Sequence, residues 1–295
     1  MKRIINGSLV SEDWPLVVGG MLATISPLIR AAGISNPEAE ARLLVSVALE
    51  WPLEQVWLHV EEPICRRDQK RIIEFLHRRL AHEPFAYISG KQEFWSQEYL
   101  VGKGCLIPRS DSECLIETAL EILPRDKINT SVLDLGTGSG CLLLSLLSEC
   151  PPLWGVGADI SSKALEYAKH NAANFRLSDR ALFIRSDWGS CLNFGFDLVV
   201  CNPPYVEAGE VSALMPEVAH YEPVVALSGG RDGLACYRLL ADQLPDLLAN
   251  DGKVCLEIGL GQASSVTDIF SKSGLQQRGE KKDLSGVTRC LVFSL

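Results

Sequence analysis

The fold of this chain is indicated by the stretch Val132-Leu133-Asp134-Leu135-Gly136-Thr137-Gly138-Ser139-Gly140, which precedes an apolar run from Cys141 to Leu147. The pattern predicts a buried strand, a glycine-rich turn and a helix, which is how a nucleotide-binding β-α-β unit begins. Glycines let the backbone approach a ligand closely, and a helix N-terminus offers free N–H groups. The dinucleotide pattern G-x-G-x-x-G would need glycine at position 141, where the chain has cysteine. The pattern is instead G-x-G-x-G, and Asp134 favours a cationic cofactor.

Two further strand patterns follow, and each ends in polar residues. The stretch from Trp154 to Ile160 contains Asp159, about 20 residues beyond the glycines, where a ribose diol is usually bound. The stretch from Ala181 to Arg185 leads to Asp187 and Trp188, which could accept from an adenine amino group and stack nearby. Taken alone, Asp187 is equally well interpreted as an ordinary loop residue. The carboxyl ends of parallel strands share one edge of a sheet, so we expect these residues to meet there.

A fourth strand pattern, from Phe196 to Val200, ends in Cys201-Asn202-Pro203-Pro204-Tyr205. Two prolines stop the strand and stiffen the backbone, because each fixes φ and lacks an N–H. Carbonyls in such a turn lie outside the ladder and can serve a ligand. An amide side chain and an aromatic ring beside them suit the binding of a flat NH2-bearing group. An ordinary turn is the alternative for this motif alone, but its place beside the other motifs favours a site.

This order of motifs resembles the class I S-adenosylmethionine-dependent methyltransferases that modify exocyclic or amide nitrogens. Further segments resemble one family among them, the release-factor glutamine N5-methyltransferases, over about residue 20 to the C-terminus. The segments are Glu83 to Gly90, Phe94, Leu106 to Glu113, Tyr221 to Pro223, Ser228 to Leu234 and Leu256 to Gly259. In one element the chain departs from the family pattern P-R-P-D-T-E, because Ser110 and Ser112 replace the proline and the threonine. This predicts a less rigid turn beside Arg109.

The resemblance implies a methyl transfer from S-adenosyl-L-methionine, leaving S-adenosyl-L-homocysteine, to the glutamine amide of the Gly-Gly-Gln motif of class I peptide-chain release factors. We expect the Asn202 side-chain oxygen and the Pro203 carbonyl to accept the two amide N–H groups, with the Tyr205 ring against the flat amide. The implied catalytic residues are Asn202, Pro203, Pro204 and Tyr205, which also bind substrate together with Arg109. The implied cofactor-binding residues are Gly136, Thr137, Gly138, Ser139, Gly140, Asp159, Asp187, Trp188 and Asn202. No metal site is expected.

Two rival hypotheses stay open at this level. The first is an N6-adenine or N2-guanine nucleic-acid methyltransferase, because the same N-P-P-Y chemistry serves any flat amine. A net charge of −9, the lack of a recognition insertion after Tyr205, and the helical region with its hairpin argue against it. The second is a non-catalytic cofactor-binding protein, which the intact Asn202 and glycine turn disfavour.

The periodicity of apolar residues predicts three regions. Residues 1–83 should form a helical, substrate-binding domain with helices over 19–33, 37–50, 54–60 and 66–82. Residues 84–107 should form a β-hairpin linker. Residues 108–295 should form a Rossmann-like doubly wound α/β domain. Its last strands are expected near 275–278 and 289–294, the final one antiparallel.

Composition is typical of a globular cytoplasmic protein, which we expect to be monomeric. The 295 residues are 47% hydrophobic and 22% charged, and no run approaches the roughly 20 apolar residues of a membrane span. Charges at Glu12 and Asp13 argue against a secretory segment. The ten cysteines show no C-x-x-C spacing and are expected to be reduced, and the five histidines are expected to be structural or on the surface. The basic residues of 66–71 and 78–79 are interpreted first as the solvated face of a helix, and a patch that contacts a partner or its RNA is the alternative.

Overall fold

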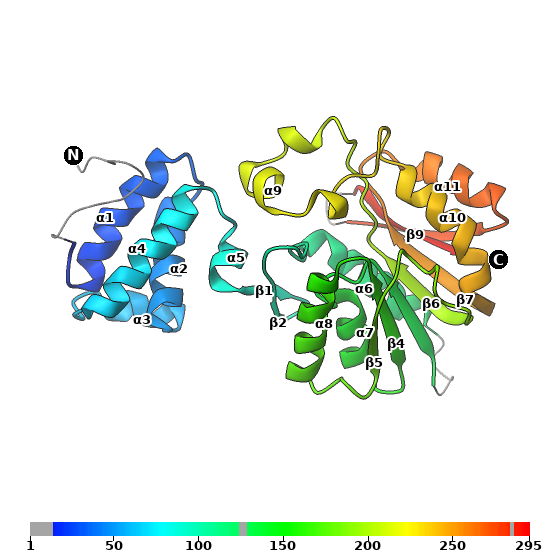
Figure 1. The fold of residues 1–295 in the computed structure, drawn as a ribbon, viewed down its shortest axis with the longest axis horizontal. Helices are drawn as coiled ribbons and strands as arrows, with labels where there is room; N and C mark the ends of the chain where they lie inside the picture. The colour runs from blue at the N-terminus through cyan, green and yellow to red at the C-terminus, as the bar shows by residue number, and fades with distance from the viewer. Residues whose placement is uncertain (1–13, 124–128, 284–285) are drawn as a thin grey trace. The chain divides into compact units, whose positions relative to one another are not determined.

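The computed structural model describes residues 14–123, 129–283 and 286–295, and the chain divides into two compact units, 1–89 and 90–295. The predicted non-secretory start of the chain lies outside the described residues. Figure 1 shows a helical first unit and a second unit built around a sheet.

The first unit contains the helices that the apolar periodicity predicts. They are α1 (Val18–Ala31), α2 (Pro37–Leu49), α3 (Leu53–Leu58) and α4 (Arg66–Leu80), followed by a short α5 (Phe85–Ser89). Pro37 occupies the first turn of α2, where a missing N–H costs nothing, and Asn36 is the N-cap residue without a side-chain cap bond. Residues such as Met21, Ile25 and Leu44 are fully buried in one apolar core.

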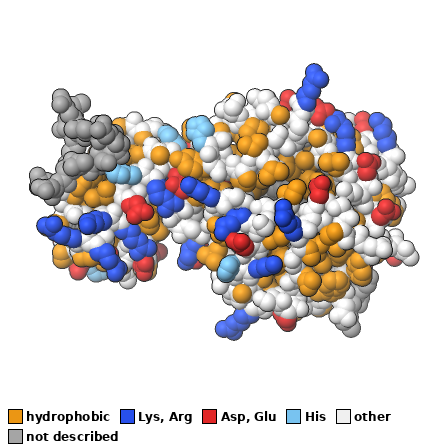
Figure 2. All heavy atoms as spheres, in the orientation of Figure 1, with side chains coloured by type: hydrophobic (Ala, Val, Ile, Leu, Met, Phe, Trp, Pro, Cys, Tyr) orange, Lys and Arg blue, Asp and Glu red, His pale blue; other side chains and the backbone are white. Residues whose placement is uncertain are grey.

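The basic residues of α4 only partly match the predicted solvated face. Figure 2 shows Lys and Arg side chains over the surface of this unit, and Arg66 and Arg67 are exposed. Arg79, however, is only 6% exposed, and its Nε donates to Glu40 over 2.8 Å. The prediction was wrong for Arg79, because an acidic partner on α2 lets the guanidinium be buried.

The prediction of a hairpin over 84–107 was too broad. The segment begins with helix α5, in which the N–H groups of Tyr87 and Ile88 donate to the Pro84 carbonyl. The hairpin itself is shorter and consists of β1 (Lys91–Phe94) and β2 (Gln97–Leu100). It belongs to the second unit, where the buried Tyr99 hydroxyl lies 2.8 Å from the Ser145 hydroxyl.

The second unit contains a seven-stranded sheet in the order β5-β4-β3-β6-β7-β9-β8. Its strands are β3 (Ser131–Leu135), β4 (Trp154–Asp159), β5 (Ala181–Arg185), β6 (Phe196–Cys201), β7 (Leu248–Glu257), β8 (Gln276–Lys282) and β9 (Thr288–Ser294). The first five are parallel, and β9 pairs antiparallel with both of its neighbours, as predicted for the last strand. The chain winds outward from β3 in both directions, so the switch point lies where β3 and β6 end side by side.

Helices cover both faces of this sheet, which confirms the predicted doubly wound fold (Figure 1). Helices α6 (Glu113–Ile122), α7 (Cys141–Glu149) and α8 (Ser162–Asn174) pack in sequence, and α10 (Ala235–Leu247) packs on α11 (Ala263–Lys272). The core beneath α10 and α11 contains Tyr237, Leu240 and Phe270 against apolar residues of the central strands. All five residues of β3 are buried, as expected of a central parallel strand covered on both faces.

A long excursion, residues 206–234, separates β6 from α10. Residues 206–234 contain two 3-10 turns, η2 (Val211–Ala213) and η3 (Val224–Ala226), and helix α9 (Pro216–Tyr221). The sequence analysis assigned no helix or strand here, although Pro216 begins α9 as a first-turn proline. The excursion bears on the site because its second half reaches the pocket described next.

Candidate active site

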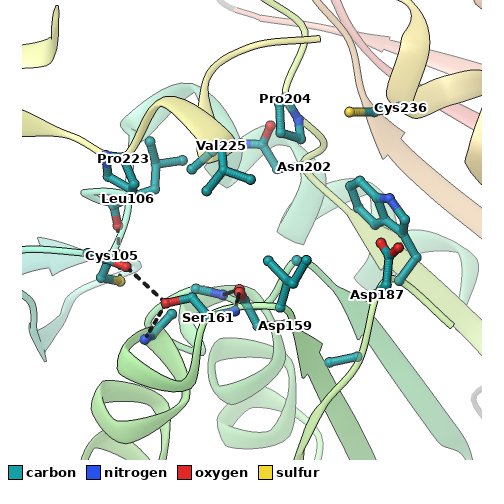
Figure 3. A pocket seen from close by; sticks show the side chains of 18 of the residues that line it. Cys105, Leu106, Asp159, Ser161, Asp187, Asn202, Pro204, Pro223, Val225 and Cys236 are labelled. Carbon is teal, nitrogen blue, oxygen red and sulfur yellow. Dashed lines mark hydrogen bonds between the residues drawn. The ribbon is translucent and has the colours of Figure 1, made fainter. Parts of the chain in front are cut away.

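A pocket of about 240 Å³ opens at the carboxyl edge of the parallel strands. It is lined by the turns that follow β3, β4, β5 and β6, by residues 104–106 after the hairpin, and by the η3 region (Figure 3). Asn202, Pro204 and Val225 lie across the open space from Asp159 and Ser161, while Asp187 lies at one end (Figure 3). The topology therefore brings the separate sequence motifs together around one cavity.

The floor of the pocket includes the glycine turn after β3. Gly136 and Gly138 have φ angles of 75° and 57°, which side chains disfavour, and both line the pocket. The predicted residues Thr137, Ser139 and Gly140 are not among the lining residues. Thr137 Oγ1 donates to Asp134 over 2.6 Å, the Ser139 carbonyl accepts from Asn171 over 2.9 Å, and Gly140 packs beneath Leu144 and Ala168. These three residues hold the turn in shape.

Asp159 joins the glycine turn to the start of α8. Its Oδ2 accepts from the Gly138 N–H over 2.9 Å, and its Oδ1 accepts from the Ser161 N–H over 2.8 Å. Burial raises the pKa of Asp159, and the backbone N–H groups oppose that rise. Ser161 caps α8 by accepting from the Ala164 N–H. Each Asp159 oxygen retains a lone pair for a ligand hydroxyl.

Asp134 lies buried at the end of β3. Its Oδ2 accepts from Thr137 and from the Leu143 N–H, whereas its Oδ1 has no hydrogen-bond partner among the described residues. Burial raises the pKa of Asp134 to about 7. An orphaned buried acceptor beside a glycine turn is the type of atom that a cationic ligand or a water satisfies.

Asp187 and Trp188 form the end wall of the pocket. Trp188 has a φ of 52°, and its ring lies 3.6 Å from the position that a Cβ at Gly136 would take. Both residues line the pocket, so the structure places them where the sequence predicted. A flat ring entering from the glycine turn would meet the indole.

The Asn202 turn forms the wall that lies across the pocket from Asp159 and Ser161 (Figure 3). Asn202 and Pro204 line the pocket, whereas Pro203 and Tyr205 are not among the lining residues. The Asn202 amide Nδ2 donates to Ser112 Oγ over 2.9 Å, which leaves Oδ1 for a ligand. The Tyr205 hydroxyl donates to Glu257 Oε1 over 3.3 Å, and burial raises its pKa.

Two glycines of the 228–234 segment allow the Asn202 turn to be packed tightly. A Cβ at Gly233 would lie 2.5 Å from the Tyr205 carbonyl oxygen, and one at Gly229 would lie 2.7 Å from that of Pro204. The Gln262 amide donates to the Tyr205 carbonyl over 3.1 Å and also to the Gly233 carbonyl. The turn is therefore held in one conformation by its neighbours.

Arg109 is tied to the excursion rather than to the pocket. Its guanidinium forms an ion pair with Glu222, whose side chain is buried and whose Oε2 also accepts from the Ile107 N–H over 3.1 Å. Arg109 is not among the lining residues. Its predicted role in substrate binding stays a prediction.

Several residues of the site were given no role from sequence. Cys105, Leu106 and Pro223 line the pocket at the end away from Asp187, and Val225 lies beside Asn202 (Figure 3). Ala226 is also among the lining residues. Ser112 and Glu257 lie behind Asn202. Both belong to segments that the sequence marked, but their 145-residue separation concealed their contact.

Neither a metal-binding cluster nor a membrane-spanning helix is found among the described residues. Across residues 14–123, 129–283 and 286–295, no group of three or more His, Cys, Asp or Glu residues could hold a metal ion. In the same ranges, no helix is long and apolar enough to cross a membrane. The ten cysteines are free thiols.

The sheet order, with a pocket at its switch point, is typical of the class I methyltransferase fold. A model described as the PrmC N-terminal domain matches residues 21–90, and one described as the methyltransferase small domain matches residues 112–220. The hMettl16 catalytic domain, solved in complex with a 3′UTR hairpin, shares the fold with a TM-score of 0.51 at 16% identity, over 64% of this chain and 72% of that chain.

Curated relatives are more closely similar. A release factor glutamine methyltransferase of Rhodospirillum rubrum is 39% identical, over 97% of this chain and 87% of that protein. One of Agrobacterium fabrum is 39% identical, over 90% and 93%. A bifunctional methyltransferase of Rickettsia conorii is 35% identical over 93% of this chain, which spans 57% of that longer protein. The chain belongs to the release factor glutamine methyltransferase family, whose members use S-adenosylmethionine.

Proposed function

We propose that this protein transfers a methyl group from S-adenosylmethionine to the side-chain amide nitrogen, N5, of the glutamine in the Gly-Gly-Gln motif of class I release factors. The observation that carries the proposal is the Asn202 side chain, which lines the pocket with its Nδ2 bonded to Ser112. The carboxamide oxygen is thereby left to accept from an incoming N–H. Membership of the family supports the choice of glutamine as the acceptor.

The pocket residues fit this cofactor. Gly136 and Gly138 have no side chains to obstruct its methionine part, and the Asp159 carboxylate retains lone pairs for the two ribose hydroxyls. Asp187 and Trp188 would hold the adenine at the end wall. When bound, S-adenosylmethionine supplies an electrophilic methyl group on sulfur, and S-adenosylhomocysteine is released.

The chain itself must make a poor nucleophile react. An amide nitrogen is weakly nucleophilic because its lone pair is delocalised into the carbonyl. The Asn202 Oδ1 and the Pro203 carbonyl would accept its two N–H groups, directing the nitrogen at the methyl group and stabilising positive charge as it develops. The Tyr205 ring would flank the flat amide. The nitrogen then loses one proton to solvent, so the product is a neutral N-methyl amide.

A release factor presents a larger surface than this pocket can hold. Specific protein interfaces usually bury about 1,200 Å² or more in total. We therefore propose that the helical first unit and the β1–β2 hairpin bind the body of the factor. The two glycines of the factor's Gly-Gly-Gln motif would let its tip enter the pocket. In this proposal the protein has no nucleic-acid substrate.

The test is direct identification of the methylated residue. Purified protein, labelled S-adenosylmethionine and a class I release factor should give one added methyl on the glutamine side chain, located by mass spectrometry. Duplex DNA and structured RNA are offered in parallel. An unmodified factor with a methylated nucleic acid would overturn the proposal in favour of an adenine or guanine methyltransferase.

Substituting Asn202 separates catalysis from cofactor binding. Asn202→Ala removes one acceptor directed at developing charge, which typically lowers turnover by about 10²–10³-fold. Cofactor affinity, measured by calorimetry, should change little, because the side chain serves mainly the acceptor amide. Asn193→Ala is the matched control, since Asn193 is exposed ahead of β6. Near-normal methylation by Asn202→Ala would exclude the proposed role.

A further inference from the structure

Asn202 is the first of three side chains joined by hydrogen bonds, and the other two are buried behind it. Asn202 Nδ2 donates to Ser112 Oγ over 2.9 Å, and Ser112 Oγ donates to Glu257 Oε2 over 2.5 Å. Ser112 and Glu257 are 3% and 2% exposed. The three residues come from the turn after β6, from η1 (Ser110–Ser112) and from the end of β7. None of the roles assigned so far requires the last two residues.

The direction of these hydrogen bonds is set by Glu257. An ionised carboxylate can only accept, so the single proton of the Ser112 hydroxyl must point toward it. Ser112 then offers only lone pairs to Asn202, which must present its Nδ2 donor to them. The carboxylate thereby selects the amide orientation that leaves Asn202 Oδ1 for the acceptor. The flipped amide would oppose N–H to N–H.

We propose that Ser112 and Glu257 are positioning residues that lock the Asn202 carboxamide with its oxygen toward the acceptor amide, an inference that rests on the glutamine methylation proposed above. Neither residue touches the reacting atoms. Their contribution is made through the orientation of one side chain.

Glu257 is surrounded by groups that affect its charge. The Tyr205 hydroxyl donates to its Oε1, and the Tyr237 hydroxyl donates to its backbone carbonyl over 3.1 Å. Asp111 from η1 disfavours the ionised carboxylate, and Arg289 from β9 favours it. The Cys201 thiol at the end of β6 stays neutral, because burial raises its pKa.

The orientation of the Asn202 carboxamide, which we call the Asn202 lock, should therefore depend on pH. Burial raises the pKa of Glu257 to about 7, although the hydrogen bonds from Ser112 and Tyr205 act to lower it. Below that pH a protonated Glu257 can donate to Ser112, whose own proton can then turn to Asn202 and favour the flipped amide. We expect kcat/KM for the release factor to rise with pH through about 7 and then to level off.

The first experiment compares three variants of one turn. Ser112→Ala should lower kcat by roughly 10- to 100-fold, with the KM for the release factor and the Kd for S-adenosylmethionine within about twofold of the original values. Ser112→Thr retains a hydroxyl and should recover most of the lost kcat. Ser110→Ala is the matched control, because Ser110 is exposed in the same turn. A Ser112→Ala enzyme with unchanged kcat would overturn the inference.

The second experiment uses the pH profile. With S-adenosylmethionine saturating, Glu257→Gln, which cannot ionise, should lose the rise of kcat/KM between about pH 6 and 8 that the original chain shows. Asp134→Asn is the control, because the pKa of the buried Asp134 is also about 7, and this variant should keep the rise. A variant that merely damaged packing would lower the whole profile and keep its inflection. The same inflection in Glu257→Gln would contradict the inference.

A third measurement decides the inference independently of the acceptor. In NMR spectra the Asn202 side-chain amide signals, assigned by their loss in Asn202→Asp, should shift with pH around 7. The shift should vanish in Ser112→Ala and in Glu257→Gln. If the Asn202 amide signals of the original chain do not change with pH, the proposed roles of Ser112 and Glu257 are overturned even if release factors are methylated. Conversely, an unmodified release factor with titrating signals would refute the proposed function and retain the lock.

Discussion

At the residue scale, Asp159 holds the glycine turn and also lines the pocket. Both carboxylate oxygens are engaged with backbone N–H groups, from Gly138 and Ser161, and the same carboxylate lines the pocket. The side chain thus links the glycine turn to the N-terminus of α8 as well as offering lone pairs to a ligand. Its position in the sequence suggested only a role in binding a ligand.

We predict that Asp159→Asn weakens S-adenosylmethionine binding by at least about tenfold. The amide removes the negative charge and turns one acceptor into a donor, and hydrogen bonds to a charged group are worth roughly 1.5–3 kcal/mol each. Isothermal calorimetry measures the effect. Asp242→Asn on the exposed face of α10 is the control, and an affinity equal to that of the control would reject the ribose assignment.

At the scale of elements, α8 connects the hairpin to the glycine turn through one side chain. The fully buried Asn171 donates to the carbonyls of Leu100 and Ser139 and accepts from the Leu100 N–H over 2.8 Å. It therefore completes the outer edge of β2 and anchors the turn that forms the pocket floor. Buried backbone groups need such partners because water cannot replace them.

Replacing this side chain should destabilise the second unit. Asn171→Ala leaves three backbone groups without their partner, and we expect the free energy of unfolding to fall by about 2–4 kcal/mol. Urea unfolding followed by circular dichroism measures the change. Asn174→Ala, exposed one turn further along α8, should alter stability by less than about 0.5 kcal/mol. Equal effects of the two variants would refute the bridging role.

At the scale of the whole molecule, the pocket belongs to one of the two units. Every residue that lines the pocket belongs to residues 90–295, and that unit has its own apolar core. The first unit has a separate core and contributes no lining residue. We therefore expect cofactor binding to depend on the second unit alone.

Residues 90–295 expressed alone should bind S-adenosylmethionine with the affinity of the full chain, within about threefold. Methylation of an intact release factor should fall at least about tenfold in kcat/KM, because most of the protein–protein surface is lost. Calorimetry and mass spectrometry give the two measurements, with circular dichroism as the check on folding. Equal methylation by both forms would show that the first unit does not bind the factor.

Regular elements and local motifs were predictable here because their causes are local. Apolar periodicity located α1 to α4 within a few residues, and strand patterns separated by glycine and proline located β3 to β6. The order of the motifs also indicated which ones share a sheet edge. The errors lay where tertiary contacts override local pattern: Arg79 is buried by its pairing with Glu40, and residues 85–89 are helical.

The sequence by itself determined the class of fold, the family resemblance and the strand-end motifs that meet at the pocket, because a parallel sheet brings the ends of its strands to one edge whatever the loops do. The tertiary structure alone decided how those residues are used. It separated the lining residues Gly136 and Gly138 from the supporting residues Thr137 and Ser139. It also placed Ser112 and Glu257 behind Asn202. Hydrogen bonds between residues 90 and 145 positions apart depend on how elements pack, and no local pattern records that geometry.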